Sequence, residues 1–315
     1  MRWLLRLLRR QSSPSASSLP WLDRLPLADP GALEEDLATA REFARRLHGR
    51  PAPAPGMSRR VQAVLHAARR RRVDELAEAV RGLSPADAVR LADALSGRAD
   101  LDRAGLDATA RKLLATAPTR EPALAALALL ALAPTPEDRP LLLRAACSAC
   151  GAPLAARAAA AMPDGRAVLD AIFEAAPGVG RALAIEAWIR ARGSAPGPDE
   201  GARLLGAAAT IGDPLDRAWA AVPLLEAVDV PALLRADPSL AEAVVLCLEA
   251  NARGGWRGGP GPGLGRLPGS LRAAEALLEG EGPAEIRRRA ARAVLDAHPA
   301  CPPRLQRLAA AASSG

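Results

Sequence analysis

Aromatic and β-branched residues are almost missing from this chain of 315 residues. It contains no tyrosine and only two phenylalanines, Phe43 and Phe173, and isoleucine and threonine are scarce. These are the side chains that fill strands, whereas the alanine and leucine that dominate here are strong helix formers. No alternating run is long enough to predict a strand. We therefore predict an all-α fold.

Cysteine is also scarce. The chain contains only Cys147, Cys150, Cys247 and Cys301, which are too few to form a disulfide scaffold in a chain of this length. Cys147 and Cys150 form a CxxC pair, which we place at the C-terminal end of a helix. There the helix dipole opposes a thiolate, so a redox role is disfavoured. We interpret the cysteines as small buried hydrophobic residues and predict neither a cofactor nor a metal site.

Catalytic and phosphate-binding motifs are missing as well. His48, His66 and His298 are isolated and lack the paired spacing of metal ligands. No nucleotide-binding loop or nucleophile motif occurs in the sequence. We therefore predict that the protein is not an enzyme.

Long apolar runs are absent, and no window reaches the ~18 apolar residues that a membrane span requires. The longest, Ala123–Ala133, lies between two prolines. The short apolar stretch near the N-terminus is broken by Arg6 and lacks a signal-cleavage site. We expect a cytoplasmic protein, with peripheral membrane association as an addition.

Positive charge is unevenly distributed. Residues 1–72 contain 15 arginines and 6 acidic residues, whereas the remainder is nearly neutral. Lys112 is the only lysine, beside 41 arginines, and this ratio is typical of a G+C-rich coding bias. The abundance of arginine is therefore weaker evidence for polyanion binding than it would otherwise be. The candidates for contact with a polyanion are Arg59, Arg60, Arg69, Arg70, Arg71 and Arg72. The alternative is a solvated helix end whose arginines cap carbonyls.

The first segment, 1–11, has the pattern of a basic amphipathic helix. Its candidates for contact with an anionic membrane are Arg2, Trp3, Leu4, Arg6, Leu7 and Leu8. Such contact is expected to be weak and to depend on salt. A Ser/Pro/Ala-rich arm, 12–57, follows and contains one predicted helix, 29–48.

The remainder, 58–312, consists of predicted helices with short connections. Most starts share one pattern, in which Ser, Thr or Asp precedes Pro and an acidic residue follows. Helix pairs recur every ~40 to 50 residues. Neighbouring pairs must stack to bury their apolar faces, which predicts an α-solenoid. The other predicted helices are 58–70, 73–80, 85–96, 106–115, 153–162, 164–175, 178–192, 201–211, 214 onward, 239–252, 270–279, 283–297 and 302–312, with a Gly/Pro loop at 254–269.

The clearest helical hairpin has helices at 123–133 and 141–150. Thr135 is placed to N-cap the second helix, and Asp138 stands where a capping box places its acid. Gly151 is predicted to be a left-handed C-cap. On neighbouring helices, Trp188 and Trp219 are predicted to pack in the core rather than to form a ligand shelf.

Two stretches, 124–143 and 167–189, the second with the Pro-Gly-Val-Gly-Arg turn at 177–181, resemble bacterial HEAT-like repeat proteins. The resemblance implies a HEAT/armadillo-like solenoid used for binding. We expect a non-enzymatic scaffold whose partner is another protein. The alternatives are a nucleic-acid-associated protein acting through the arginine-rich N-terminal quarter and a peripheral membrane adaptor.

Overall fold

The computed structural model describes residues 21–24, 38–42, 56–192, 195–252, 267–280, 282–296 and 301–314. These residues are helical apart from short connections, and none of them forms a strand, as the composition predicts. Segment 1–11, most of the predicted helix 29–48 and most of the predicted Gly/Pro loop lie outside this part of the chain. No helix within it is long and apolar enough to cross a membrane.

The helices begin largely where the capping pattern predicts. The Ser84 hydroxyl accepts the N–H of Asp87 at 3.2 Å at the start of α6. Asp213 accepts the N–H of Leu215 at 2.8 Å at the start of α14. The helices are α2 (Trp21–Arg24), α4 (Met57–Arg70), α5 (Val73–Ala79), α6 (Pro85–Ser96), α7 (Arg103–Thr116), α8 (Arg120–Leu130), η3 (Pro136–Asp138), α9 (Arg139–Ala145), α10 (Gly151–Ala160), α11 (Gly165–Ala175), α12 (Gly178–Arg192), α13 (Pro198–Ala209), α14 (Pro214–Ala227), α15 (Val230–Ala236), η4 (Pro238–Leu240), α16 (Ala241–Ala252), α17 (Pro268–Glu279), α18 (Ala284–Asp296) and α19 (Pro303–Ser314).

The predicted N-cap of the second hairpin helix, Thr135, is confirmed. The first turn after it is the 3₁₀ helix η3, and regular α9 begins at Arg139. Thr135 and Asp138 form the capping box, and the Asp138 carboxylate accepts the Thr135 N–H at 2.8 Å. The same carboxylate also accepts the Thr135 hydroxyl at 3.2 Å. The box therefore fixes how the chain enters α9.

The predicted end of that helix is wrong. Regular α9 ends at Ala145, and Gly151 begins α10 instead of forming a left-handed C-cap. A β-carbon on Gly151 would lie 2.2 Å from the Ala145 carbonyl oxygen. The Ser148 hydroxyl accepts the N–H of Gly151 at 3.1 Å. Glycine is therefore needed here for close approach between two helices and not for a positive φ.

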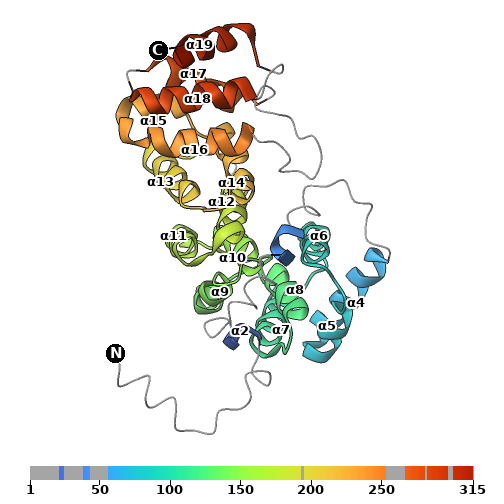
Figure 1. The fold of residues 1–315 in the computed structure, drawn as a ribbon. Coiled ribbons are helices and arrows are strands. Elements are labelled where there is room, and N and C mark those ends of the chain that lie inside the picture. The colour runs from blue at the N-terminus through green and yellow to red at the C-terminus, as the bar shows by residue number, and fades with distance from the viewer. Residues whose placement is uncertain are drawn as a thin grey trace, which may run out of the picture.

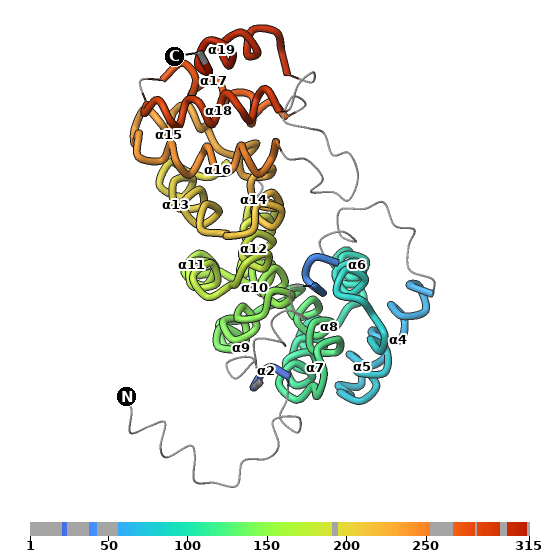
Figure 2. The backbone as a smooth tube through the Cα atoms, in the orientation of Figure 1, coloured from blue at the N-terminus to red at the C-terminus, as the bar shows by residue number. Residues whose placement is uncertain are grey.

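Successive helices contact one another along an elongated array, with α4–α8 at one end and α17–α19 at the other (Figure 1). One row runs through α10, α12, α14, α16 and α18, each helix contacting the next. Beside it, α9 contacts α11, α13 contacts α15, and α17 contacts both α15 and α19. Figure 2 follows the chain along this array.

Alanine and leucine make up most of the buried core. All residues from Ala123 to Leu130 are buried in α8, which packs against α6, α7 and α10. A helix that is apolar all round must be covered on every side. The small alanine side chains allow these neighbours to approach closely.

The start of α17 is fixed by a residue of α14. The Glu226 carboxylate accepts the N–H groups of Gly269 and Ser270 at 2.8 and 3.1 Å. A β-carbon on Gly269 would lie 2.1 Å from the Leu225 carbonyl oxygen. The predicted C-terminal end of the Gly/Pro loop, residue 269, is wrong, because α17 begins at Pro268 and Gly269 is buried within it. Two short helices, α2 and α15, were not predicted from the sequence.

Candidate binding groove

An open groove of about 920 Å³ is lined by α15, η4, the first residue of α16, α17 and α18, near the C-terminal end of the array. Its apolar lining consists of Pro231, Leu234, Pro238, Ala241, Ala276, Leu277, Pro283 and Ile286, with Gly280 and Gly282 between α17 and α18. Its charged lining consists of Arg235, Arg272, Glu275 and Glu279. An apolar floor with a few charged side chains is the usual composition of a binding surface.

The charges of the groove are unbalanced toward positive. Arg304 of α19 contacts the carboxylates of Glu275 at 3.1 Å and Glu279 at 2.8 Å. Arg235 and Arg272 are exposed, and no acidic side chain in the described part of the chain pairs with either. The two acids are therefore partly neutralised from the side, whereas the two arginines are available to an acidic ligand.

Local capping builds one wall of the groove. Asp229 accepts the N–H of Ala232 at 3.0 Å and begins α15, with Pro231 in its first turn. Asp237 accepts the N–H of Ser239 at 3.0 Å and begins η4. The Asp-x-Pro and Asp-Pro signals were present in the sequence. The first of these signals could have predicted α15 and, with it, the groove residue Arg235.

The arginine cluster of the N-terminal quarter is largely engaged within the chain. Arg69 lies 3.3 Å from Asp100, while Arg70 and Arg72 lie 3.9 and 3.6 Å from Glu75. These ion pairs join exposed side chains and contribute little stability, but they reduce the positive field of the cluster.

Two further arginines of this cluster act on helix ends. Arg60 donates to the carbonyl oxygens of Ala79 at 3.2 Å and Arg81 at 2.8 Å, at the C-terminal end of α5. Arg71 ends α4 with a positive φ of 53°, in a left-handed turn. Arg59 is exposed on the first turn of α4. Carbonyl capping was the alternative to polyanion contact, and Arg60 performs it.

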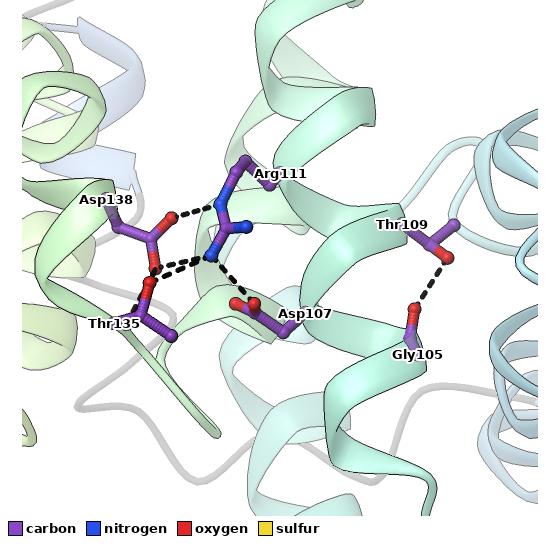
Figure 3. Close-up of polar contacts among 6 residues, drawn as sticks. All are labelled: Gly105, Asp107, Thr109, Arg111, Thr135 and Asp138. Atoms are coloured by element: carbon purple, nitrogen blue, oxygen red, sulfur yellow. Dashed lines mark hydrogen bonds and ion pairs between the residues drawn. The ribbon is translucent and has the colours of Figure 1, made fainter.

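A second polar cluster joins α7 to the beginning of α9 (Figure 3). Arg111 donates from Nε to Asp138 at 2.5 Å and from Nη2 to Asp107 at 2.8 Å and Thr135 at 2.9 Å. Asp138 is fully buried and Asp107 is 8% exposed. Arg111 therefore holds two carboxylates that come from different helices.

The charge of Asp107 is the least well compensated in this cluster. Its Oδ1 is buried and has no hydrogen-bond partner in the described part of the chain. Burial, reinforced by the charge of Asp138, raises the pKa of Asp107 to about 6 although Arg111 opposes the shift. Nearby, the Thr109 hydroxyl donates a hydrogen bond to the Gly105 carbonyl oxygen at 2.7 Å. Two buried acids around one guanidinium form a joint between helices, and the pKa of one of them lies near neutrality.

The cysteines agree only in part with their interpretation. Cys150, Cys247 and Cys301 are buried, and burial raises the pKa of the Cys247 thiol to about 12. Cys147 is exposed, because it lies in the turn after α9 and not within the longer helix that was predicted. Cys150 precedes α10 and thus lies at a helix N-terminus, contrary to the prediction.

The isolated histidines and the tryptophans complete the sequence candidates. His66 is exposed, 3.8 Å from Glu75, while His48 and His298 lie outside the described residues. Trp188 and Trp219 are buried, as predicted. Trp188 packs edge-to-face on Phe173 at 6.5 Å between ring centroids. Trp188 also lines a small pocket of about 180 Å³.

Within the described residues, no three His, Cys, Asp or Glu side chains gather in a way that could hold a metal ion. No protein-family model matches the chain, and comparison with curated proteins and with solved structures finds no match.

Proposed function

We propose that the chain is a HEAT-like α-solenoid scaffold that binds another protein, without catalysis, through the groove between α15, η4, α17 and α18. The row-by-row contacts of successive helices support this architecture. The observation that carries the binding proposal is the pairing of an apolar lining with Arg235 and Arg272, whose charges no described acid neutralises. The residues of the repeat domain are 58–312, preceded by the basic arm.

The chemistry of the groove specifies the partner. Its apolar side chains accept the hydrophobic face of a helix, and the two arginines accept carboxylates at the edge of that face. We therefore expect an amphipathic helical segment with acidic flanks. Because the arginines are exposed, their contribution is to orientation and association rate, and it weakens with salt.

A designed peptide tests this proposal. Its helix carries a leucine face flanked by glutamates, and its binding to the full chain is followed by fluorescence anisotropy. Arg235→Glu/Arg272→Glu should weaken binding at least about tenfold. Arg139→Glu/Arg307→Glu is the matched control, since both arginines are exposed and neither lines the groove. This control should bind as the parent chain does.

The competing functions predict different results, each with its own probe. Equal binding to all three chains would refute the groove as the site. Binding of a single-stranded oligonucleotide that is lost on replacing Arg59, Arg69 and Arg71 would favour the nucleic-acid interpretation. Salt-dependent sedimentation with anionic vesicles, lost on deleting residues 1–11, would favour the membrane adaptor.

A further inference from the structure

A short helical segment of the N-terminal arm, residues 38–42, lies against α14, although about 170 residues separate them in the sequence. Ala40 is fully buried. Arg41 donates from Nε to Asp216 Oδ1 at 2.8 Å and from Nη2 to Asp216 Oδ2 at 2.7 Å. Its Nη2 also reaches Asp213 Oδ2 at 3.1 Å. Figure 1 draws this segment in blue between α6 and α10.

The receiving surface is built into the first turn of α14. Asp213 uses Oδ1 to accept the N–H groups of Leu215 and Asp216 at 2.8 and 3.3 Å, which leaves Oδ2 for Arg41. The Asp216 side chain is 5% exposed. Both carboxylates stand in the first turn of α14, where the helix dipole favours negative charge. Capping fixes the position of Asp213, so that its Oδ2 and the Asp216 carboxylate receive the Arg41 guanidinium together.

An exposed apolar side chain stands beside this acidic pair. Leu215 is 58% exposed, more than any other large hydrophobic side chain in the described part of the chain. It lies between Asp213 and Asp216 in sequence, on the turn that holds Arg41. The Leu215 side chain therefore stays exposed beside the two carboxylates when residues 38–42 are in place, and a longer ligand could cover it as well.

We infer that the first turn of α14 is a second peptide-binding site, specific for an arginine-bearing helical segment, and that residues 38–42 occupy it in cis. The Arg41 side chain is 40% exposed, so the ion pair remains accessible for exchange. A segment of five residues makes a small contact, which binds weakly by itself. Tethering within one chain raises its effective concentration to the millimolar range, and this keeps the site filled.

The inference predicts that the site opens when the tethered arginine is removed. The probe is a labelled peptide with the sequence of residues 33–47, tested on the full chain by anisotropy. Arg41→Glu places a carboxylate against two others and expels the tethered segment. The peptide should bind this variant at least about tenfold more tightly than the parent chain, in which it must compete with its tethered copy.

Two controls assign the site to α14. Adding Asp216→Asn to Arg41→Glu should abolish binding of the peptide. Adding Asp199→Asn should leave it unchanged, because Asp199 is an exposed acid at the start of a different helix, α13. If Arg41→Glu lowers the melting temperature too far, the milder Arg41→Ala serves in its place, and the same order of affinities is expected.

Equal peptide binding by the parent chain and the Arg41 variants would overturn the inference. So would a lack of binding by all of them, which would make residues 38–42 a permanent part of the fold. A parent chain that is dimeric at micromolar concentration, and monomeric as Arg41→Ala, would also overturn the assignment in cis, since the segment would then belong to a neighbouring copy.

Discussion

Replacing Asp107 with asparagine should change how stability depends on pH. Burial and the nearby Asp138 raise the pKa of the Asp107 carboxyl from 3.8 to about 6 in the folded chain. The folded state therefore holds this proton more tightly than the unfolded state does. The stabilisation that follows is fully present below pH 4 and is lost as the pH rises through 6.

The size of the effect follows from the shift. A change from 3.8 to about 6 corresponds to at most ~3 kcal/mol between pH 4 and pH 7.5. The asparagine of the Asp107→Asn variant has no proton to lose, and it keeps an oxygen that can accept from Arg111. The difference in unfolding free energy between the variant and the parent should therefore move in favour of the variant by ~1 to 3 kcal/mol across this range.

Urea titrations at several pH values measure this difference, because each pair of curves cancels the contributions of all other groups. Asp100→Asn is the control with the opposite sign. The pKa of Asp100 is lowered by its hydrogen bond from Arg98, so its loss should favour the parent chain above pH 4. If the Asp107→Asn difference stays constant from pH 4 to pH 7.5, then Asp107 is not a buried, poorly compensated charge, and the account of the cluster is wrong.

Three further predictions concern stability, each measured by chemical denaturation with circular dichroism. Gly151→Ala should destabilise the chain by more than ~3 kcal/mol, because the new β-carbon meets a backbone carbonyl. Gly206→Ala should instead stabilise it by ~0.5 to 1 kcal/mol, because a β-carbon there lies in open space. Similar values for the two variants would refute the close approach at Gly151. Thr135→Ala should cost ~1 kcal/mol, and no change would mean that the box around Asp138 does not need the hydroxyl. Cys150→Ala should cost ~1 to 3 kcal/mol and Cys147→Ala less than ~0.5 kcal/mol, because only the first is buried; equal losses would contradict this.

Local signals could be read from the sequence, and these gave the helix starts. Ser84 and Asp213 precede proline, and each caps its helix as expected. The meaning of a glycine could not be read in the same way. Gly151 follows a helical pattern in the manner of a C-cap, but its role depends on how close the Ala145 carbonyl lies in space. Sequence alone does not distinguish these two uses.

The candidate sites depend on partners that are distant in sequence. Arg235 and Arg272 stand out because they line one groove in which Arg304, a residue of another helix, engages the neighbouring acids. Likewise, nothing near Arg41 in the sequence indicates Asp216 as its partner. The composition predicted that the chain is helical and that its N-terminal quarter is basic, but it could not indicate which charges remain free.

The cap that Glu226 places on α17 has a mechanical consequence. In an array held only by contacts between adjacent helices, a force applied at the C-terminus would peel the helices off one at a time. Here α17 contacts α14, α15 and α16, and its first turn is held by a carboxylate of α14. Under tension, α18 and α19 should detach first, and α14 to α17 should then yield together as one larger step in extension.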